Sequence, residues 1–250
     1  MKIATWNVNG IRARQVQLED WIKSERPDVI CLQEIKAAPE QIPESLVSID
    51  GYWCYWHGGK GYSGVGLHVR KDVVGECPNF FHPAFDHEHR VVAAAVNGLT
   101  VTSVYVPNGG KDFAAKMKFF GALEEYAATM QGAGTPLVIC GDINIAHTDL
   151  DVHPKERKAN AIGQLPEERA AFDRLLGHGL RDVGRALHPD DPDFFTWWAP
   201  WRNLRQRNIG WRIDYILASD AVAGRATACE SYREVGTSDH APLVMTVDWP

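Results

Sequence analysis

The chain has 250 residues, of which 45% are hydrophobic and 23% are charged. This is the composition of a globular protein that can bury a sizeable core. No segment reaches the roughly 20 unbroken apolar residues that a membrane helix requires, and the first residues do not resemble a secretory leader. We therefore expect one domain over residues 1–250, located in the cytoplasm, with no membrane partner.

The net charge of −6 excludes a general binder of polyanions but allows a local basic face. Residues 201–212 contain four arginines and no acidic residue. Taken alone, this stretch is more simply a solvated loop. The five cysteines are odd in number and form no CxxC pair, so we expect neither a disulfide framework nor a thiolate zinc site.

Short runs rich in Val and Ile predict eight strands. In chain order they are Lys2–Trp6, Asp28–Leu32, Val65–Val69, Val91–Val96, Val101–Val106, Leu137–Cys140, Ile213–Leu217 and Leu243–Val247. Apolar residues at helical spacing predict helices around residues 18–22, 119–130 and 166–176. The last of these begins at Pro166 with acidic residues in its first turn and ends at Gly177, as the helix dipole and a C-cap favour. Many strands are consecutive, which favours an α/β sandwich of two sheets with helices outside.

Polar residues follow, interrupt or precede these strands at six places. They are Asn7–Gly10, Gln33–Glu34, Pro107–Asn108, Gly141–Asn144, Asp214 and Ser238–Pro242. Strand ends that meet at one edge form the usual cleft of a layered protein. Each cluster alone has a structural interpretation as a turn, a cap or a strand end, but the six together favour a functional site.

Four of these polar residues are acids, namely Glu34, Asp142, Asp214 and Asp239. Four carboxylates at one edge would repel one another unless a cation compensates them. Ligands that are all oxygen suit Mg²⁺ or Mn²⁺. His240 beside them could polarise a phosphate oxygen. This set of side chains predicts metal-assisted hydrolysis of a phosphate ester.

At this point the motifs resemble a known family. They are Trp6–Arg12, Leu32–Glu34, Tyr105–Asn108, Gly141–Asn144, Trp211–Tyr215 and Ser238–Pro242. In order and in spacing they are similar to the exonuclease III group of abasic-site endonucleases, within the endonuclease/exonuclease/phosphatase superfamily. The resemblance spans residues 6 to 242. It implies a DNase I-like fold, which is a four-layer α/β sandwich with two mixed β-sheets packed together and helices outside.

The resemblance also implies roles for the site residues. Glu34 would be the main Mg²⁺ ligand, with Asn7 or Asn9 and Asp239 nearby. Asp142, oriented by Asn144, would activate the attacking water or assist the leaving oxygen, and the family leaves both roles open. His240, paired with Asp214, would contact the scissile phosphate. Tyr105 and Asn108 would be donors on the phosphate side.

Loop residues in this family separate abasic endonucleases from their relatives. By resemblance, Trp197, Trp211 and Ile213 would form the wall of a pocket for an extruded sugar without a base. Extrusion is cheapest where no base pair has to be broken. The positions that would face DNA are Arg12, Lys60, Tyr62, Arg90, Lys111, Asn160, Arg207 and Asn208. For each of them an ordinary surface position is the alternative interpretation.

The sequence departs from the family pattern in two segments. His89 stands where the family often has glycine, and with His82 and His87 nearby a second metal site is one interpretation. A polar loop in which the histidines occur by chance is the interpretation we favour. Residues 155–163 match the family poorly, so that only Asn160 is available as a phosphate contact and its register is open.

The sequence therefore predicts a Mg²⁺-dependent DNA repair enzyme, in which Mn²⁺ can substitute. It would cut the phosphodiester bond 5′ to an abasic site in duplex DNA and remove 3′-blocking groups, and the resemblance also allows 3′–5′ exonuclease activity. We expect a monomer with no obligate protein partner. One alternative is a superfamily phosphoesterase that acts on a small or lipid-borne phosphate. Another is a DNA-binding module whose catalytic site has decayed.

Overall fold

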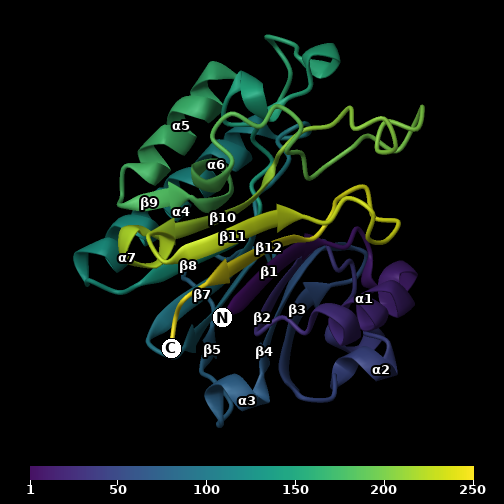
Figure 1. Ribbon diagram of the computed structural model, residues 1–250, viewed down its shortest axis with the longest axis vertical. Helices are drawn as coiled ribbons and strands as arrows, with labels where there is room; N and C mark the ends of the chain where they lie inside the picture. The colour runs from purple at the N-terminus through teal and green to yellow at the C-terminus, as the bar shows by residue number, and fades with distance from the viewer.

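Two six-stranded sheets pack face to face in the computed structural model, which describes residues 1–250 (Figure 1). The first sheet has the strand order β11 (Ala226–Ser231), β12 (Leu243–Val247), β1 (Lys2–Asn7), β2 (Val29–Gln33), β4 (Tyr62–Arg70) and β3 (Tyr52–Gly59). The second has the order β5 (Phe80–Phe81), β6 (Val91–Val96), β7 (Leu99–Tyr105), β8 (Leu137–Asp142), β10 (Asp214–Ser219) and β9 (Leu180–Asp182). Both sheets are mixed, because β1 pairs with β2 and β7 pairs with β8 in parallel while the other pairs are antiparallel.

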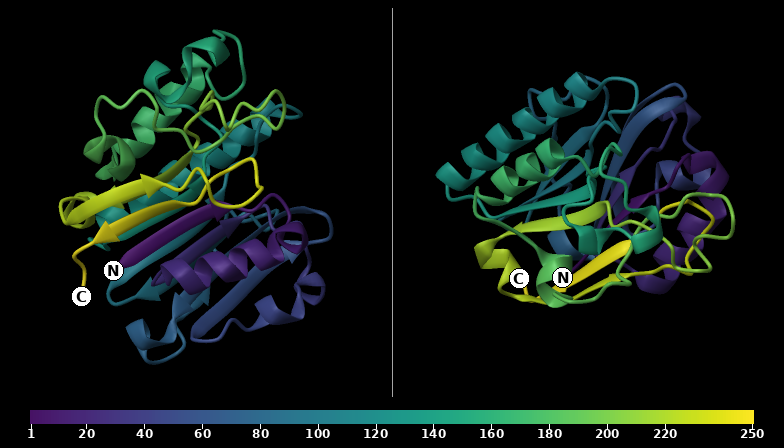
Figure 2. Two further views of the ribbon diagram at one scale, coloured as in Figure 1. Left: turned by 45° about the vertical axis from the view of Figure 1, so that its right-hand side comes forward. Right: turned by 90° about the horizontal axis from the view of Figure 1, so that it is seen from above.

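Helices cover the outer faces of both sheets. The helices are α1 (Ile11–Glu25), α2 (Glu44–Val47), α3 (Lys71–Val74), α4 (Phe113–Gly132), α5 (Pro166–Leu176), α6 (Val183–Leu187) and α7 (Asp220–Ala223), with 3₁₀ turns at Pro39–Gln41, Asp149–Asp151 and Pro154–Glu156. Figure 2 shows α1 on one side of the molecule and α4 with α5 on the other. This is the predicted four-layer sandwich. The helices all lack the combination of length and apolar character needed to cross a bilayer.

The alternation of side chains along the strands explains the layers. In β1, Ile3 contributes to the core between the two sheets, whereas Ala4 and Trp6 pack in the core that includes α1. In β8, Val138 belongs to the core between the sheets and Ile139 to the one beneath α4 and α5. Successive side chains of a strand point to opposite faces. Strands covered on both faces therefore read as the unbroken apolar runs seen in the sequence.

All eight predicted strands are present, and the strands missed by the prediction lie at or near the edges of the sheets. The strands β3 and β11 are edge strands of the first sheet, and β5 and β9 are those of the second. Edge strands are exposed on one side or are very short, so they lack the long apolar pattern that predicts a strand. The predicted third helix begins at Pro166 as expected, and a carboxylate oxygen of Glu168 accepts from the Leu165 N–H at 3.0 Å.

Candidate active site

The polar motifs that follow the strands meet at one edge of the sandwich. Asn7 at the end of β1 is the register partner of Gln33 at the end of β2. Asp142 at the end of β8 is the register partner of both Tyr105 in parallel β7 and Asp214 in antiparallel β10. The ends of these strands therefore carry their polar side chains into a shared cleft, as the sequence predicted.

Two hydrogen bonds join the two sheets within this cleft. The side-chain amide of Asn7, from the first sheet, donates to Asp142 Oδ2 of the second at 2.9 Å. The hydroxyl of Tyr105, from the second sheet, donates to Oε1 of Glu34 from the first at 2.6 Å. Burial, together with the charge of Glu34, raises the pKa of Tyr105, so its phenol remains a donor. The site is thus built from both sheets, and neither sheet contains it alone.

Asp142 has the environment of a proton-transferring carboxylate. Its Oδ1 accepts from the Asn144 backbone N–H at 2.9 Å, and its Oδ2 accepts from the Asn144 side-chain amide at 3.1 Å. Burial raises the pKa of Asp142 to about 7, and the charges of Asp214 and Glu34 act in the same direction while His240 opposes them. A group with a pKa near neutrality both accepts and releases a proton efficiently at physiological pH.

His240 and Asp214 form a buried pair next to Asp142. His240 Nδ1 lies 2.8 Å from Asp214 Oδ2, and His240 Nε2 lies 3.9 Å from Asp142 Oδ2. Burial alone would lower the pKa of His240, but the charges of Asp214, Asp142 and Asp239 raise it to about 10. The imidazole is therefore a cation at neutral pH, so that both ring nitrogens are donors. Nδ1 donates to Asp214, which leaves Nε2 for a group in the cleft.

Oxygen ligands for a metal ion lie on the other side of the cleft. Asp239 Oδ1 accepts from the Asn9 side-chain amide at 2.7 Å, and Asn9 Oδ1 accepts from Lys36 Nζ at 2.6 Å. Glu34 Oε2 has only Lys36 Nζ nearby, at 3.6 Å. Carboxylate and amide oxygens with this spare acceptor capacity suit a divalent cation.

Several residues of the cleft hold a left-handed backbone conformation. Their φ angles are 43° at Asn9, 52° at Glu34, 51° at Lys36 and 55° at Asn144. Such angles are uncommon in residues other than glycine and concentrate at functional sites, where the surrounding structure maintains them. In this protein they follow the ends of three strands, β1, β2 and β8, and all four residues line the same cavity.

A cavity of about 360 Å³ opens directly from these groups. Its lining includes every predicted catalytic, metal and pocket residue except Asp214, which lies behind His240: Asn7, Asn9, Glu34, Tyr105, Asn108, Asp142, Asn144, Trp197, Trp211, Ile213, Asp239 and His240. The rings of Trp197 and Trp211 meet edge to face at 5.6 Å. The Trp197 indole N–H also donates to Asp239 Oδ2 at 3.0 Å, which ties the aromatic wall to the candidate metal ligands.

Two residues that line the cavity were absent from the sequence prediction. Lys36 places a positive charge between Asn9 and Glu34, and Ile162 adds an apolar side chain to the lining. The signal for Lys36 was its position two residues after Glu34. Ile162 gave no signal, because it lies in the segment 155–163 that matches the family poorly.

The predicted DNA-facing residues differ in their exposure. Arg12, Lys60, Tyr62, Lys111, Asn160 and Arg207 are exposed, which is consistent with DNA contact but does not test it. Arg90 is only 3% exposed, and its guanidinium donates to the Tyr62 hydroxyl at 2.6 Å and to the Tyr105 carbonyl at 3.3 Å. For Arg90 the structure therefore indicates a supporting position beneath Tyr62, and direct contact with DNA stays a prediction.

The arginine-rich stretch 201–212 is not the uniform basic loop that the sequence indicated. Arg212 is 1% exposed and pairs with Asp151 and Asp182 at 2.7 Å each. Arg205 donates to backbone carbonyls, including those of Arg233 and Val235 at 2.7 and 2.8 Å. Both arginines have a structural role, because each connects segments that are distant in the sequence. Only Arg202 and Arg207 of the four are exposed.

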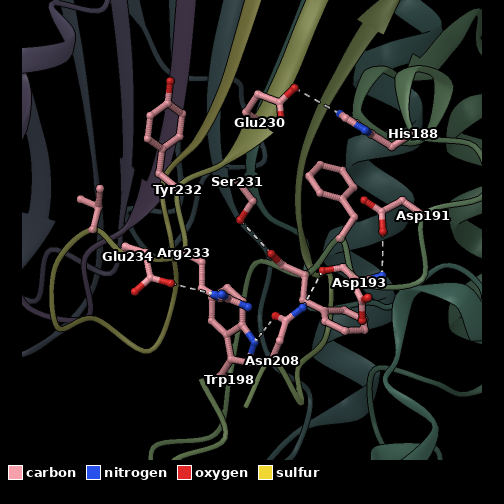
Figure 3. A pocket seen from close by; sticks show the side chains of 13 residues that line it. His188, Asp191, Asp193, Trp198, Asn208, Glu230, Ser231, Tyr232, Arg233 and Glu234 are labelled. Carbon is pink, nitrogen blue, oxygen red and sulfur yellow. Dashed lines mark hydrogen bonds and ion pairs between the residues drawn. The ribbon is translucent and has the colours of Figure 1, made fainter. Parts of the chain in front are cut away.

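A different hollow, of about 440 Å³, lies behind this stretch (Figure 3). Asn208 faces it, since its side chain accepts from the Trp198 indole at 3.2 Å and donates to the Asp193 carbonyl at 2.9 Å. Four carboxylates line the hollow: Asp191, Asp193, Glu230 and Glu234. His188 and Arg233 also line the hollow, and they lie 3.5 Å from Glu230 and 3.0 Å from Glu234. A DNA contact by Asn208 stays a prediction.

The arrangement matches a known family. A family model described as endonuclease/exonuclease/phosphatase matches residues 4–240. The chain belongs to this family. It is 35% identical to exodeoxyribonuclease III of Haemophilus influenzae over 97% of this chain and 98% of the relative. It is 34% identical to the DNA repair nuclease APEX1 of Danio rerio over 98% of this chain and 81% of the relative.

Solved structures of the endonuclease/exonuclease/phosphatase family share the whole fold. A 3′–5′ exonuclease from Neisseria meningitidis superposes with a TM-score of 0.91 at 34% identity, covering all of both chains. A Neisseria 3′ phosphatase bound to a product DNA hairpin superposes with a TM-score of 0.90 at 35% identity, again covering all of both chains. An abasic-site endonuclease from Archaeoglobus fulgidus superposes with a TM-score of 0.86 at 31% identity, covering 99% of each chain. The predicted DNase I-like fold and the predicted exonuclease III relationship are both confirmed.

Proposed function

We propose that this protein is a metal-dependent DNA repair phosphodiesterase that acts as one domain. It hydrolyses the phosphodiester bond on the 5′ side of an abasic site in duplex DNA and removes blocking groups from 3′ ends. The main support is that the buried pair of Asp142 and His240 opens directly into a cavity walled by Trp197, Trp211 and Ile213. Polar residues suited to phosphate chemistry and an aromatic and apolar wall thus share one cavity.

Each polar residue has a defined task in this proposal. Asp142, with its pKa near 7, takes or returns the proton that moves at the scissile phosphate. The cationic His240 donates through Nε2 to a phosphate oxygen, while Asp214 fixes the orientation of the ring. Asn108 donates to Asn144 Oδ1 at 3.1 Å and so connects the phosphate side of the cavity to Asp142. Donors positioned in advance stabilise the charge that develops on the phosphate oxygens.

Mg²⁺ is the metal that we assign to the site, with Mn²⁺ as a substitute. Glu34, Asp239 and an amide oxygen of Asn7 or Asn9 would hold it, because this donor set is entirely oxygen. When bound, such an ion neutralises phosphate charge and polarises the P–O bond. Glu34, whose charge contributes to the raised pKa of Asp142, is also one of the proposed ligands of this cation.

The DNA-binding surface consists of the exposed basic and polar residues around the cleft. We assign contacts with the phosphate backbone to Arg12, Lys60, Lys111 and Arg207, and further contacts to Tyr62 and Asn160. Phosphate contacts position a duplex without reading its sequence, as an enzyme that recognises a missing base requires. The protein would act as a monomer without an obligate protein partner, in the cytoplasm.

The test uses end-labelled duplex DNA with one central abasic analogue, next to the undamaged duplex, with Mg²⁺ or with EDTA. We expect one Mg²⁺-dependent cut at the lesion and none in undamaged DNA. A ladder from the 3′ end on both duplexes would make the enzyme chiefly an exonuclease and would contradict the abasic preference. A parallel assay of 3′-phosphate removal ranks the two repair activities. Cleavage of inositol phosphates without any cleavage of DNA would replace the proposal with the small-phosphate alternative.

A further inference from the structure

A second group of metal-ligand side chains gathers outside the catalytic cavity. His57 lies in β3, and His82 and Asp86 follow β5. One potential ligand atom from each of the three lies within 4.8 Å of the others. The sequence indicated His82 but not His57 as a candidate metal ligand, because 24 residues separate the two histidines and β3 and β5 belong to different sheets. None of the three side chains lines the catalytic cavity.

Asp86 is held in place as an oriented carboxylate. Its side chain is 3% exposed, and Oδ1 accepts from the backbone N–H groups of Arg90 at 2.6 Å and Val91 at 3.1 Å. The other oxygen, Oδ2, lies 2.5 Å from His57 Nε2. One carboxylate oxygen of Asp86 is therefore aimed at the two imidazoles.

His82 has a polar neighbour at each ring nitrogen, and its Nδ1 lies 3.8 Å from Asp86 Oδ2. Its Nδ1 lies 2.9 Å from the Val91 carbonyl oxygen, an acceptor that requires a proton on Nδ1. The lone pair is then on Nε2, which lies 2.9 Å from the Tyr55 hydroxyl. A ring N–H donated to a backbone carbonyl is the usual outer-sphere contact of metal-binding histidines. The His82 ring faces that of His57, with the centroids 3.8 Å apart.

We propose that His57, His82 and Asp86 form a binding site for a divalent transition-metal ion of the Zn²⁺ type. Two imidazole nitrogens and one carboxylate oxygen are a donor set that Zn²⁺ prefers and Mg²⁺ does not. The site therefore differs in chemistry from the all-oxygen cluster of the catalytic cavity. His89, whose exposed ring lies 4.6 Å from that of His57, is close enough to approach the open side.

The bound ion would connect β3 to the loop that supports the catalytic rim. Asp86 already holds the backbone N–H of Arg90, and the Arg90 guanidinium supports Tyr62 and the carbonyl of Tyr105. A metal that joins Asp86 to His57 would thus restrain the segment beneath the exposed ring of Tyr62. Its role is structural, and it would support the DNA-facing surface without entering the reaction.

The test is a titration of metal-free protein with Co²⁺ and Zn²⁺ in a large excess of Mg²⁺, which occupies the oxygen site. Calorimetry gives the stoichiometry, and the visible spectrum of Co²⁺ reports nitrogen ligands. We expect the wild type to bind one equivalent of Co²⁺ or Zn²⁺ tightly. This binding should be lost in His57→Ala, His82→Ala and Asp86→Asn. His147→Ala is the matched control, because His147 also faces a carboxylate, Asp173, at 2.7 Å but has no second imidazole. The His147→Ala variant should still bind one equivalent of metal.

A measurement on the wild type alone avoids any loss of folding in the variants. Diethyl pyrocarbonate modifies accessible imidazoles, and mass spectrometry locates the products. Zn²⁺ should protect His57 and His82 and leave His147 as reactive as before. Three results would each overturn the proposal. The first is tight Zn²⁺ or Co²⁺ binding that persists in His57→Ala and His82→Ala, and the second is wild-type protein that binds no Zn²⁺ or Co²⁺ when Mg²⁺ is in excess. The third is equal modification of the histidines with and without Zn²⁺.

Discussion

At the residue scale, the pKa of Asp142 separates it from the other carboxylates of the cleft. Asp142 is 2% exposed and accepts hydrogen bonds on both oxygens, yet its pKa rises to about 7. The pKa of Asp239 is instead lowered, because hydrogen bonds from Asn9 and Trp197 and the charge of His240 outweigh its burial. Two carboxylates whose environments move their pKa values apart are expected to have different tasks, in agreement with the proposed roles of Asp142 in proton transfer and of Asp239 as a metal ligand.

Asp142→Asn keeps the size of the side chain and removes its ability to accept a proton. We expect cleavage to fall by about 10²–10⁴-fold, the usual range for a group in general acid–base catalysis. DNA binding, measured by fluorescence anisotropy, should change little. Asp20→Asn, at an exposed position of α1, is the control and should cleave normally. Near-normal turnover of the Asp142 variant would remove this residue from the mechanism.

Trp211→Ala tests the aromatic wall. Trp211 lines the cavity and packs against Trp197, so its loss should enlarge the space that accepts a sugar without a base. We expect abasic-site cleavage to fall more than removal of a 3′-phosphate, when kcat/KM is compared on both substrates. Trp249→Ala, in the C-terminal segment, is the matched control. Equal losses on both substrates would make Trp211 a packing residue.

At the scale of elements, a buried ion pair connects α4 and α5 to the catalytic cleft. Lys116 of α4 and Glu168 of α5 are both 0% exposed, and their charged atoms lie 2.5 Å apart. Lys116 Nζ also donates to the backbone carbonyls of Asn108 at 3.1 Å and Asn144 at 2.7 Å. Burial outweighs the attraction of Glu168 and lowers the pKa of Lys116. The pair thus sets the positions of two active-site asparagines from behind.

Lys116→Met removes one partner and leaves Glu168 buried without a counter-charge. We expect a loss of about 3–5 kcal/mol in the free energy of unfolding, measured with urea. Adding Glu168→Gln should restore part of this stability, because it removes the buried charge and keeps an acceptor for the N–H groups of Gly163 and Leu165. Cleavage should stay reduced in the double variant, since both asparagine carbonyls lose their donor. Lys118→Met, at an exposed position of the same helix, should match the wild type in stability and cleavage. Full cleavage activity of the double variant would refute this positioning role.

The strands and the catalytic motifs could be predicted because their signals are local. In β8, a run of four apolar residues leads directly into Gly141 and Asp142, so the sequence places the strand and its catalytic end together. Strand β3 was missed because most of its side chains are only half-buried at a sheet edge. The roles of Arg212 and Lys116 could not be predicted either. Their partners Asp151 and Glu168 lie 61 and 52 residues away, and no spacing in the sequence indicates such pairs.

At the scale of the whole molecule, one buried histidine makes stability depend on pH. His68 in β4 is 0% exposed and packs against the Trp56 ring at 4.4 Å. Burial lowers the pKa of His68 to about 3, outweighing a weaker contact with the Leu67 backbone. In the unfolded chain its pKa is about 6.5. Between these values the unfolded state binds the extra proton, so the contribution of His68 to stability is lost as the pH falls below about 6.5.

His68→Leu should remove this dependence. Between about pH 7 and pH 5 the wild type should lose about 2 kcal/mol more than the variant in the free energy of unfolding. Urea unfolding at the two pH values measures the difference, and comparing variant with wild type cancels the other titrating groups. Parallel changes in both proteins would show that His68 already accepts a proton in the folded state.

The catalytic cleft joins the two sheets, and this has a consequence for partial unfolding. Asn7 and Glu34 belong to the first sheet, whereas Asp142 and Tyr105 belong to the second. A local opening in which the sheets separate would divide the reacting groups even while every strand stayed hydrogen-bonded to its neighbours. Loss of cleavage on heating should therefore come before or with the loss of β-structure and never after it. For the same reason, a proteolytic fragment that retains a single intact sheet would be inert.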